Sequence, residues 1–176
     1  MKLKGTVSLL LLGALALSGC DNTATTSNPV GESSLRLTNA SALPESGFRA
    51  EITLVDAPAK LRVGQRETIQ VRIKNGSGVK WYARGGEINT FPDNRYFIAV
   101  GNRWLRIDRS LITNMDGRYG IPEDLGAGQE TAVPLQITAP ASVGEYILEV
   151  DVVQEQVAWF SDKGSTPASF RVTVVR

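Results

Sequence analysis

The stretch "TIQVRIKN" at residues 68–75 decides the fold class of this chain. Its apolar residues Ile69, Val71 and Ile73 alternate with polar ones, so they fall on one face of an extended backbone. The stretch ends on an asparagine that precedes a glycine, a pair that favours a turn. The pattern therefore predicts a β-strand with one buried face and one exposed face.

Six further stretches have the same strand-like texture, and turns that contain glycine or proline separate them. They cover residues 51–55, 96–100, 103–107, 132–138, 146–153 and 170–175. Gly101-Asn102 lies between two of them at the two-residue spacing of a tight hairpin. Because no helical period of useful length appears beside them, the sequence predicts an all-β fold.

Short strands with turns about every ten residues favour an antiparallel β-sandwich of immunoglobulin type, with a jelly roll as the alternative. Tyr146 opens a strand two residues after Gly144, as the tyrosine of a tyrosine corner does. Trp81 follows the second main strand, where an immunoglobulin-like sandwich buries its tryptophan. The single cysteine, Cys20, excludes a disulfide within the chain, so we expect hydrophobic packing alone to join the sheets.

The first twenty residues have the layout of a secretory signal. Lys2 and Lys4 precede an apolar run at residues 7–17, and small residues follow it. The run is shorter than the roughly 20 apolar residues that a membrane-spanning helix needs. It therefore predicts a cleaved signal peptide rather than a permanent membrane span.

Leu17, Ser18, Gly19 and Cys20 together resemble the lipobox of bacterial lipoproteins. The resemblance implies cleavage before Cys20, a diacylglycerol on its sulfur, and an acyl chain such as palmitate on the new amino terminus. Two or three such chains anchor a protein durably, whereas one chain binds a membrane only marginally. Asp21 resembles the signal that retains lipoproteins of enteric Gram-negative bacteria in the inner membrane. We expect a lipid-anchored protein that faces the periplasm; a free cysteine in a cleaved or cytosolic chain is the alternative.

Composition divides the chain into three parts. Residues 1–19 are the predicted signal peptide, 20–47 are the lipidated cysteine with a flexible linker poor in large apolar side chains, and 48–176 are the predicted immunoglobulin-like β-sandwich domain. Loss of the signal removes Lys2 and Lys4 and lowers the formal net charge from +1 to −1. Because the remaining chain has no basic excess, we do not expect it to bind nucleic acid.

The second half of the chain resembles the immunoglobulin-like module found beside glycosyltransferases and other polysaccharide-processing enzymes of bacteria. The resemblance is carried by Pro122, Asp124-Leu125, Gly128, Ala139-Pro140, Gly144, Tyr146, residues 153–155, Trp159-Phe160 and Gly164. It covers about residues 64–176 and is most specific at 140–164. It implies an accessory β-sandwich module and no catalytic mechanism.

The stretch "VQEQVAWFSDKGSTPAS" at residues 153–169 is too long for a minimal hairpin connection, so we expect it to project between the last two strands. Loops at the end of a sandwich commonly bind partners, so we predict a partner-contact surface in this stretch. It comprises Glu155, Trp159, Phe160, Asp162 and Lys163. The alternative is that one or both aromatic side chains close the end of the core.

A carbohydrate site is a second hypothesis. Trp104 and Arg106 share one face of a predicted strand, and an exposed aromatic ring beside a polar group suits a sugar. Ordinary solvated residues on a strand face are the alternative. Asp116 is a possible metal ligand, but its surroundings lack the dense carboxylates of a calcium loop, and a turn explains it better.

The residue types present argue against an enzyme. The chain has no histidine, and lipid would block Cys20. We therefore predict no cofactor beyond the covalent lipid. The leading hypothesis is a noncatalytic, membrane-anchored periplasmic lipoprotein that docks on an envelope protein and takes part in polysaccharide handling; direct carbohydrate binding is the alternative.

Overall fold

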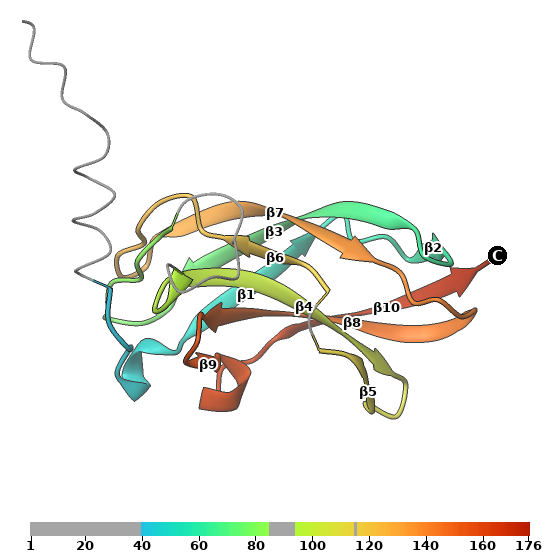
Figure 1. Ribbon diagram of the computed structural model, residues 1–176. Helices are drawn as coiled ribbons and strands as arrows, with labels where there is room; N and C mark the ends of the chain where they lie inside the picture. The colour runs from blue at the N-terminus through green and yellow to red at the C-terminus, as the bar shows by residue number, and fades with distance from the viewer. Residues whose placement is uncertain (1–39, 85–93, 115) are drawn as a thin grey trace, which may run out of the picture.

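A computed structural model describes residues 40–84, 94–114 and 116–176. The predicted signal peptide, with Leu17, Ser18, Gly19, Cys20 and Asp21, lies outside the described residues. Within those ranges the chain forms two β-sheets that pack face to face (Figure 1). None of the helices in this part of the chain has the length and apolar character of a membrane span.

The smaller sheet has three strands in the order β1-β3-β7. They are β1 (Ala50–Val55), β3 (Arg66–Asn75) and β7 (Glu130–Thr138), and both pairings are antiparallel. The stretch that predicted the fold class lies within β3. Its residues Ile69, Val71 and Ile73 are all buried between the sheets, as their alternation predicts.

The larger sheet has the order β2-β10-β8-β4-β5. These strands are β2 (Lys60–Arg62), β4 (Ile98–Arg106), β5 (Leu111–Thr113), β8 (Gly144–Gln154) and β10 (Ala168–Val175). β2 pairs in parallel with β10, while the other pairs on this path are antiparallel. Two short strands extend the sheet: β6 (Arg118–Gly120) pairs with β4, and β9 (Ala158–Trp159) pairs with β8.

The division of strands between the sheets is that of an immunoglobulin-type sandwich. β1, β3 and β7 correspond to strands A, B and E of that fold. The opposing sheet is built from β4, β8 and β10, which correspond to strands C, F and G. The prediction of an immunoglobulin-like β-sandwich is therefore confirmed, and the jelly roll is not what the chain adopts.

Two aromatic residues occupy the positions that the sequence predicts. The hydroxyl of Tyr146 donates to the backbone carbonyl of Ser142 at 2.9 Å, which is the bond of a tyrosine corner. Trp81 is fully buried, and its Nε1 donates to the carbonyl of Gly47 at 3.0 Å. Trp81 is not in a long strand, however, because it forms only an isolated bridge with Leu125 before β4 begins.

The predicted hairpin at Gly101-Asn102 is wrong, because β4 runs straight through both residues. The amide of Asn102 is buried and bonds to the chain around Asp116, and Gly101 lies under the ring of Trp159. Gly101 and Asn102 therefore make contacts with residues distant in the sequence and do not form a local turn.

The packed part of the chain also begins earlier than the predicted boundary at residue 48. Gln154 accepts a bond from the backbone N–H of Leu43 at 2.9 Å and donates to the carbonyl of Ser41 at 2.8 Å. The short 3-10 helix η1 (Glu45–Gly47) follows, and Gly47 is buried. The last residues of the predicted linker thus belong to the sandwich, since they supply polar partners to buried groups.

Candidate functional site

The connection between β8 and β10 folds back onto the larger sheet instead of projecting. β9 pairs with the end of β8, and the 3-10 helix η3 (Ser161–Lys163) follows it. Phe160 is fully buried and packs edge-on against Phe48 and Trp81, with centroids 5.0 Å away in both pairs. The prediction of Phe160 as a contact residue is wrong, and its alternative role as a plug of the core is confirmed.

Trp159 points the other way, to the outer face of the larger sheet, and is half-buried. The guanidinium carbons of Arg103 and Arg118 lie 4.2 Å and 4.5 Å from its ring centroid, within the range of cation–π contacts. Its ring edge lies over Gly101, where a Cβ would come within 2.9 Å of it. The indole is thus held by the protein's own side chains.

Two acidic side chains lie beside this stack, the buried Asp151 and the half-buried Glu155. Burial raises the pKa of Asp151, although backbone N–H groups of Val152 and Ser161 donate to its carboxylate at 2.8 Å and 3.0 Å. Burial also raises the pKa of Glu155, whose carboxylate lies 3.4 Å from the Arg118 guanidinium. Because Asp151 binds η3 and Glu155 pairs with an arginine of β6, these acids hold the β9–η3 connection to the sheet.

The remaining two residues of the predicted contact surface are exposed. Asp162 and Lys163 lie in η3, and Lys163 Nζ contacts the Glu45 carboxylate at 2.7 Å. The five predicted residues therefore do not form one open surface: Phe160 is inside, Glu155 and Trp159 are half-buried, and only the η3 pair faces solvent.

The prediction of Trp104 as an exposed sugar platform is wrong. Trp104 is buried between the sheets, with its ring edge-on to Tyr146 at 6.4 Å, whereas Arg106 is exposed at the end of β4. Its neighbour Leu105 is buried as well, because Ile147 of β8 lies beside it on the outer face. With both faces of β4 covered here, alternation along the strand does not reveal which residue is exposed.

Asp116 is a structural acid. Its Oδ2 accepts from Nδ2 of Asn102 at 3.1 Å, from Nε1 of Trp104 at 3.2 Å and from the backbone N–H of Thr138 at 2.5 Å. It thereby ties β4 to the end of β7. The described part of the chain holds no group of three or more acidic, cysteine or histidine side chains arranged for a metal ion.

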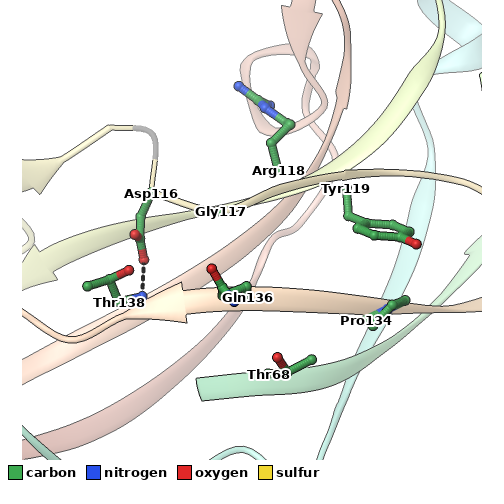
Figure 2. Close-up of a pocket in the computed structure, with 8 residues that line it drawn as sticks. All are labelled: Thr68, Asp116, Gly117, Arg118, Tyr119, Pro134, Gln136 and Thr138. Carbon is green, nitrogen blue, oxygen red and sulfur yellow. Dashed lines mark hydrogen bonds between the residues drawn. The ribbon is translucent and has the colours of Figure 1, made fainter. Parts of the chain in front are cut away.

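A pocket lies where the segment 116–119 passes along β7 (Figure 2). Its volume is about 480 Å³, and it is lined by Thr68, Asp116, Gly117, Arg118, Tyr119, Pro134, Gln136 and Thr138. Thr68 and Gln136 belong to the outer face of the smaller sheet and are exposed. Figure 2 shows the Tyr119 ring directed toward β7 and the Arg118 side chain directed away from it. Sequence reasoning missed this pocket, because its residues come from three separate stretches.

The end of the sandwich farthest from residue 40 carries exposed apolar side chains. Ile107, Leu111 and Val143 are 41%, 51% and 52% exposed. They lie in the β4–β5 hairpin and just before β8, and Arg106 at the end of β4 pairs with Tyr146 near the start of β8. We call these three residues the distal apolar patch. A hollow of about 580 Å³ beside it is lined by Arg106, Ile107, Asp108, Gly144, Glu145 and Tyr146.

The sequence matches no family model and no curated protein. Among solved structures, it is similar to a β-glucosidase from Listeria innocua in complex with glucose, at 17% identity and a TM-score of 0.44, over 73% of this chain and 16% of that one. It is also similar to the CARDB domain of a Pyrococcus furiosus protein in complex with di-metal ions, at 19% identity and a TM-score of 0.40. That match covers 72% of this chain and 86% of the CARDB chain. A sporulation control protein from Bacillus subtilis matches at 13% identity and a TM-score of 0.42, over 73% of this chain and 49% of that protein's chain. The chain thus spans only a small part of the length of the β-glucosidase.

Proposed function

We propose that this protein is a lipid-anchored, noncatalytic β-sandwich module of the bacterial cell envelope that docks on another envelope protein through its distal apolar patch. The observation that carries the proposal is the position of this patch. β8 begins beside Val143 and runs for eleven residues, about 35 Å, to Gln154. Gln154 binds the first described residues of the chain, so the patch lies at the opposite end from them (Figure 1).

An anchor at Cys20 would present this end of the molecule to partners. The lipid would hold the chain at the membrane, and the residues between Cys20 and the sandwich would lead to its near end. The distal apolar patch would then face away from the bilayer, where a protein partner can reach it.

The composition of the distal end suits a protein partner. Apolar side chains in the patch are bordered by the charged side chains of Arg106, Asp108 and Glu145, which line the adjoining hollow. An apolar centre with a polar rim is the usual anatomy of a protein–protein interface. Isolated exposed apolar residues are common on any protein, whereas an exposed apolar surface rimmed by polar residues is characteristic of a contact surface.

A noncatalytic role is supported by how the acidic residues are used. Asp116 and Asp151 accept backbone or side-chain N–H groups, and Glu155 pairs with Arg118. With no histidine in the sequence, the usual general base of a hydrolase is lacking. Trp104 offers no platform for a sugar, since its side chain is buried.

Photo-crosslinking in cells tests the proposal. A photoreactive amino acid at position 143 of the full lipidated protein is expected to give one discrete protein adduct. The same amino acid at position 157 is the matched control, because Val157 is also about 40% exposed but lies near the opposite end, in the β8–β9 turn. The adduct at 143 is expected to disappear when Leu111→Glu places a charge in the patch.

Cys20→Ser tests the anchor separately. The unlipidated variant is expected to leave the membrane fraction and to lose most of the adduct in cells, because tethering raises its effective concentration near a membrane partner. An adduct that forms equally at 143 and 157, or that survives Leu111→Glu, would contradict docking at the distal patch.

A further inference from the structure

We propose that the pocket between segment 116–119 and the outer face of β7 binds one neutral sugar residue of a polysaccharide. This inference does not rest on the docking function. The pocket opens on the smaller sheet, whereas the distal apolar patch belongs to the β4–β5 hairpin and the start of β8.

The pocket has the size and rigidity of a ligand site. Its volume of about 480 Å³ falls within the range of small-molecule pockets. Its rim is held in place by Asp116, which is bonded to β4 and to the end of β7. Gly117 passes so close to β7 that a Cβ there would lie 2.0 Å from the Gln136 carbonyl oxygen. A rim fixed in this way needs little ordering when a ligand enters.

The lining favours a hydroxyl-rich ligand. Thr68, Tyr119 and Thr138 have hydroxyls and Gln136 has an amide, groups that both donate and accept hydrogen bonds. Sugar hydroxyls also donate and accept, so the two sets are complementary. No leucine, isoleucine, valine or phenylalanine lines the pocket, which argues against an apolar ligand.

The charged residues of the lining favour a neutral ligand. The Asp116 carboxylate already accepts three N–H groups at its Oδ2, so much of its negative charge is compensated within the protein. The Arg118 side chain points away from β7 and lies over the Trp159 ring on the other sheet (Figure 2). Neither charge is therefore offered to an ionic ligand.

Two apolar surfaces complete the match. The Tyr119 ring is directed toward β7, and Pro134 lies in the floor below it (Figure 2). A pyranose ring has an apolar C–H face and a polar hydroxyl edge, so it can pack against the tyrosine while its hydroxyls reach Thr68 and Gln136. Because Thr68 and Gln136 are exposed, neighbouring sugar units of a longer chain have room outside the pocket.

Isothermal titration calorimetry tests the proposal on the full lipidated protein in micelles of a detergent without a sugar head group. The probes are maltohexaose and cellohexaose, which present neutral hexopyranose units in curved and extended chains. We expect at least one of them to bind in the millimolar range. Tyr119→Ala is expected to weaken this binding about tenfold, and Tyr119→Phe much less, because the phenyl ring keeps the packing surface.

Gln136→Ala is a second variant that tests whether misfolding explains a loss of binding. The Gln136 side chain is exposed, so its removal leaves the core intact. It is expected to weaken binding several-fold, whereas the matched Gln156→Ala, in the exposed β8–β9 turn, is expected to bind like the parent protein. Absence of binding to both hexasaccharides would overturn the proposal, as would equal affinity in the parent and in Gln136→Ala. Leu111→Glu leaves sugar binding unchanged, so failure of distal docking and failure of this pocket are distinguishable.

Discussion

A single glycine determines where Trp159 lies. Gly101 is in the middle of β4, and a Cβ there would meet the Trp159 ring at 2.9 Å, Nη1 of Arg118 at 3.1 Å and the Gly117 carbonyl at 3.2 Å. Glycine is usually unfavourable inside a strand, so its presence here indicates a close approach that no other residue permits. The absence of that one Cβ lets β9 and β6 both approach β4.

We predict that Gly101→Ala lowers the free energy of unfolding by about 1–3 kcal/mol, the usual effect of overpacking. Urea titration followed by tryptophan fluorescence measures this change, because the displaced indole is itself a reporter. Gly78→Ala is the matched control: its added Cβ meets nothing within 4 Å, so its stability is expected to stay the same or rise slightly. Equal stability of both variants would show that Trp159 moves aside without cost.

At the residue scale, local motifs could be predicted from the sequence and exposures could not. The corner at Tyr146 and the burial of Trp81 follow from their positions beside strong strands. The burial of Trp104 and Phe160 depends on which distant segments cover them, Asp116 in one case and Phe48 in the other. Such contacts do not change the hydrophobic periodicity of the sequence around the residue, so that periodicity cannot predict them.

At the element scale, strand length decided what could be predicted. The long strands have enough residues for one-sided alternation to appear, and β3 is the clearest example. β2, β5, β6 and β9 have only two or three residues each. They form because a longer strand supplies their hydrogen-bond partners, so their own sequences contain no comparable signal. The proposed sugar pocket depends on β6 and was therefore missed with it.

The segment before β6 is fastened to the sandwich by Asp116. Its Oδ2 is the shared acceptor of three N–H groups from β4 and β7, including the buried Trp104 indole. We predict that Asp116→Ala lowers the free energy of unfolding by about 3 kcal/mol, because partly buried donors lose their acceptor. Asp116→Asn keeps one acceptor oxygen and is expected to cost less.

Urea unfolding of both variants measures this effect, with Asp162→Ala as the control. Asp162 is an exposed acid in η3, so its removal is expected to change stability by no more than about 0.5 kcal/mol. If Asp116→Ala were as stable as Asp162→Ala, the segment 116–119 would have to be held by other contacts. Asp116 would then not be the residue that keeps the rim of the proposed sugar pocket in place.

For the whole molecule, the segment 41–47 connects the start of the sandwich to the end of the larger sheet and to the buried Trp81. Its Gly47 carbonyl satisfies the buried Trp81 indole, which in turn packs on Phe160 from the β8–β10 connection. Ser41 and Leu43 bond to the Gln154 side chain at the end of β8. Residues far apart in the sequence are thus joined at the end of the molecule nearest the proposed anchor, opposite the distal apolar patch.

We predict that a chain beginning at residue 48 is less stable than one beginning at residue 40 by about 2–4 kcal/mol. The truncation leaves the Trp81 Nε1 buried without its acceptor and removes the packing of Leu43 against the core. Thermal and urea unfolding of the two chains measure the difference. Lys163→Ala in the longer chain is the control for the Glu45 ion pair, which is largely exposed and is expected to contribute less than about 1 kcal/mol. Equal stability of the two chains would mean that residues 41–47 rest on the sandwich without stabilising it, and the linker would then extend to the originally predicted boundary.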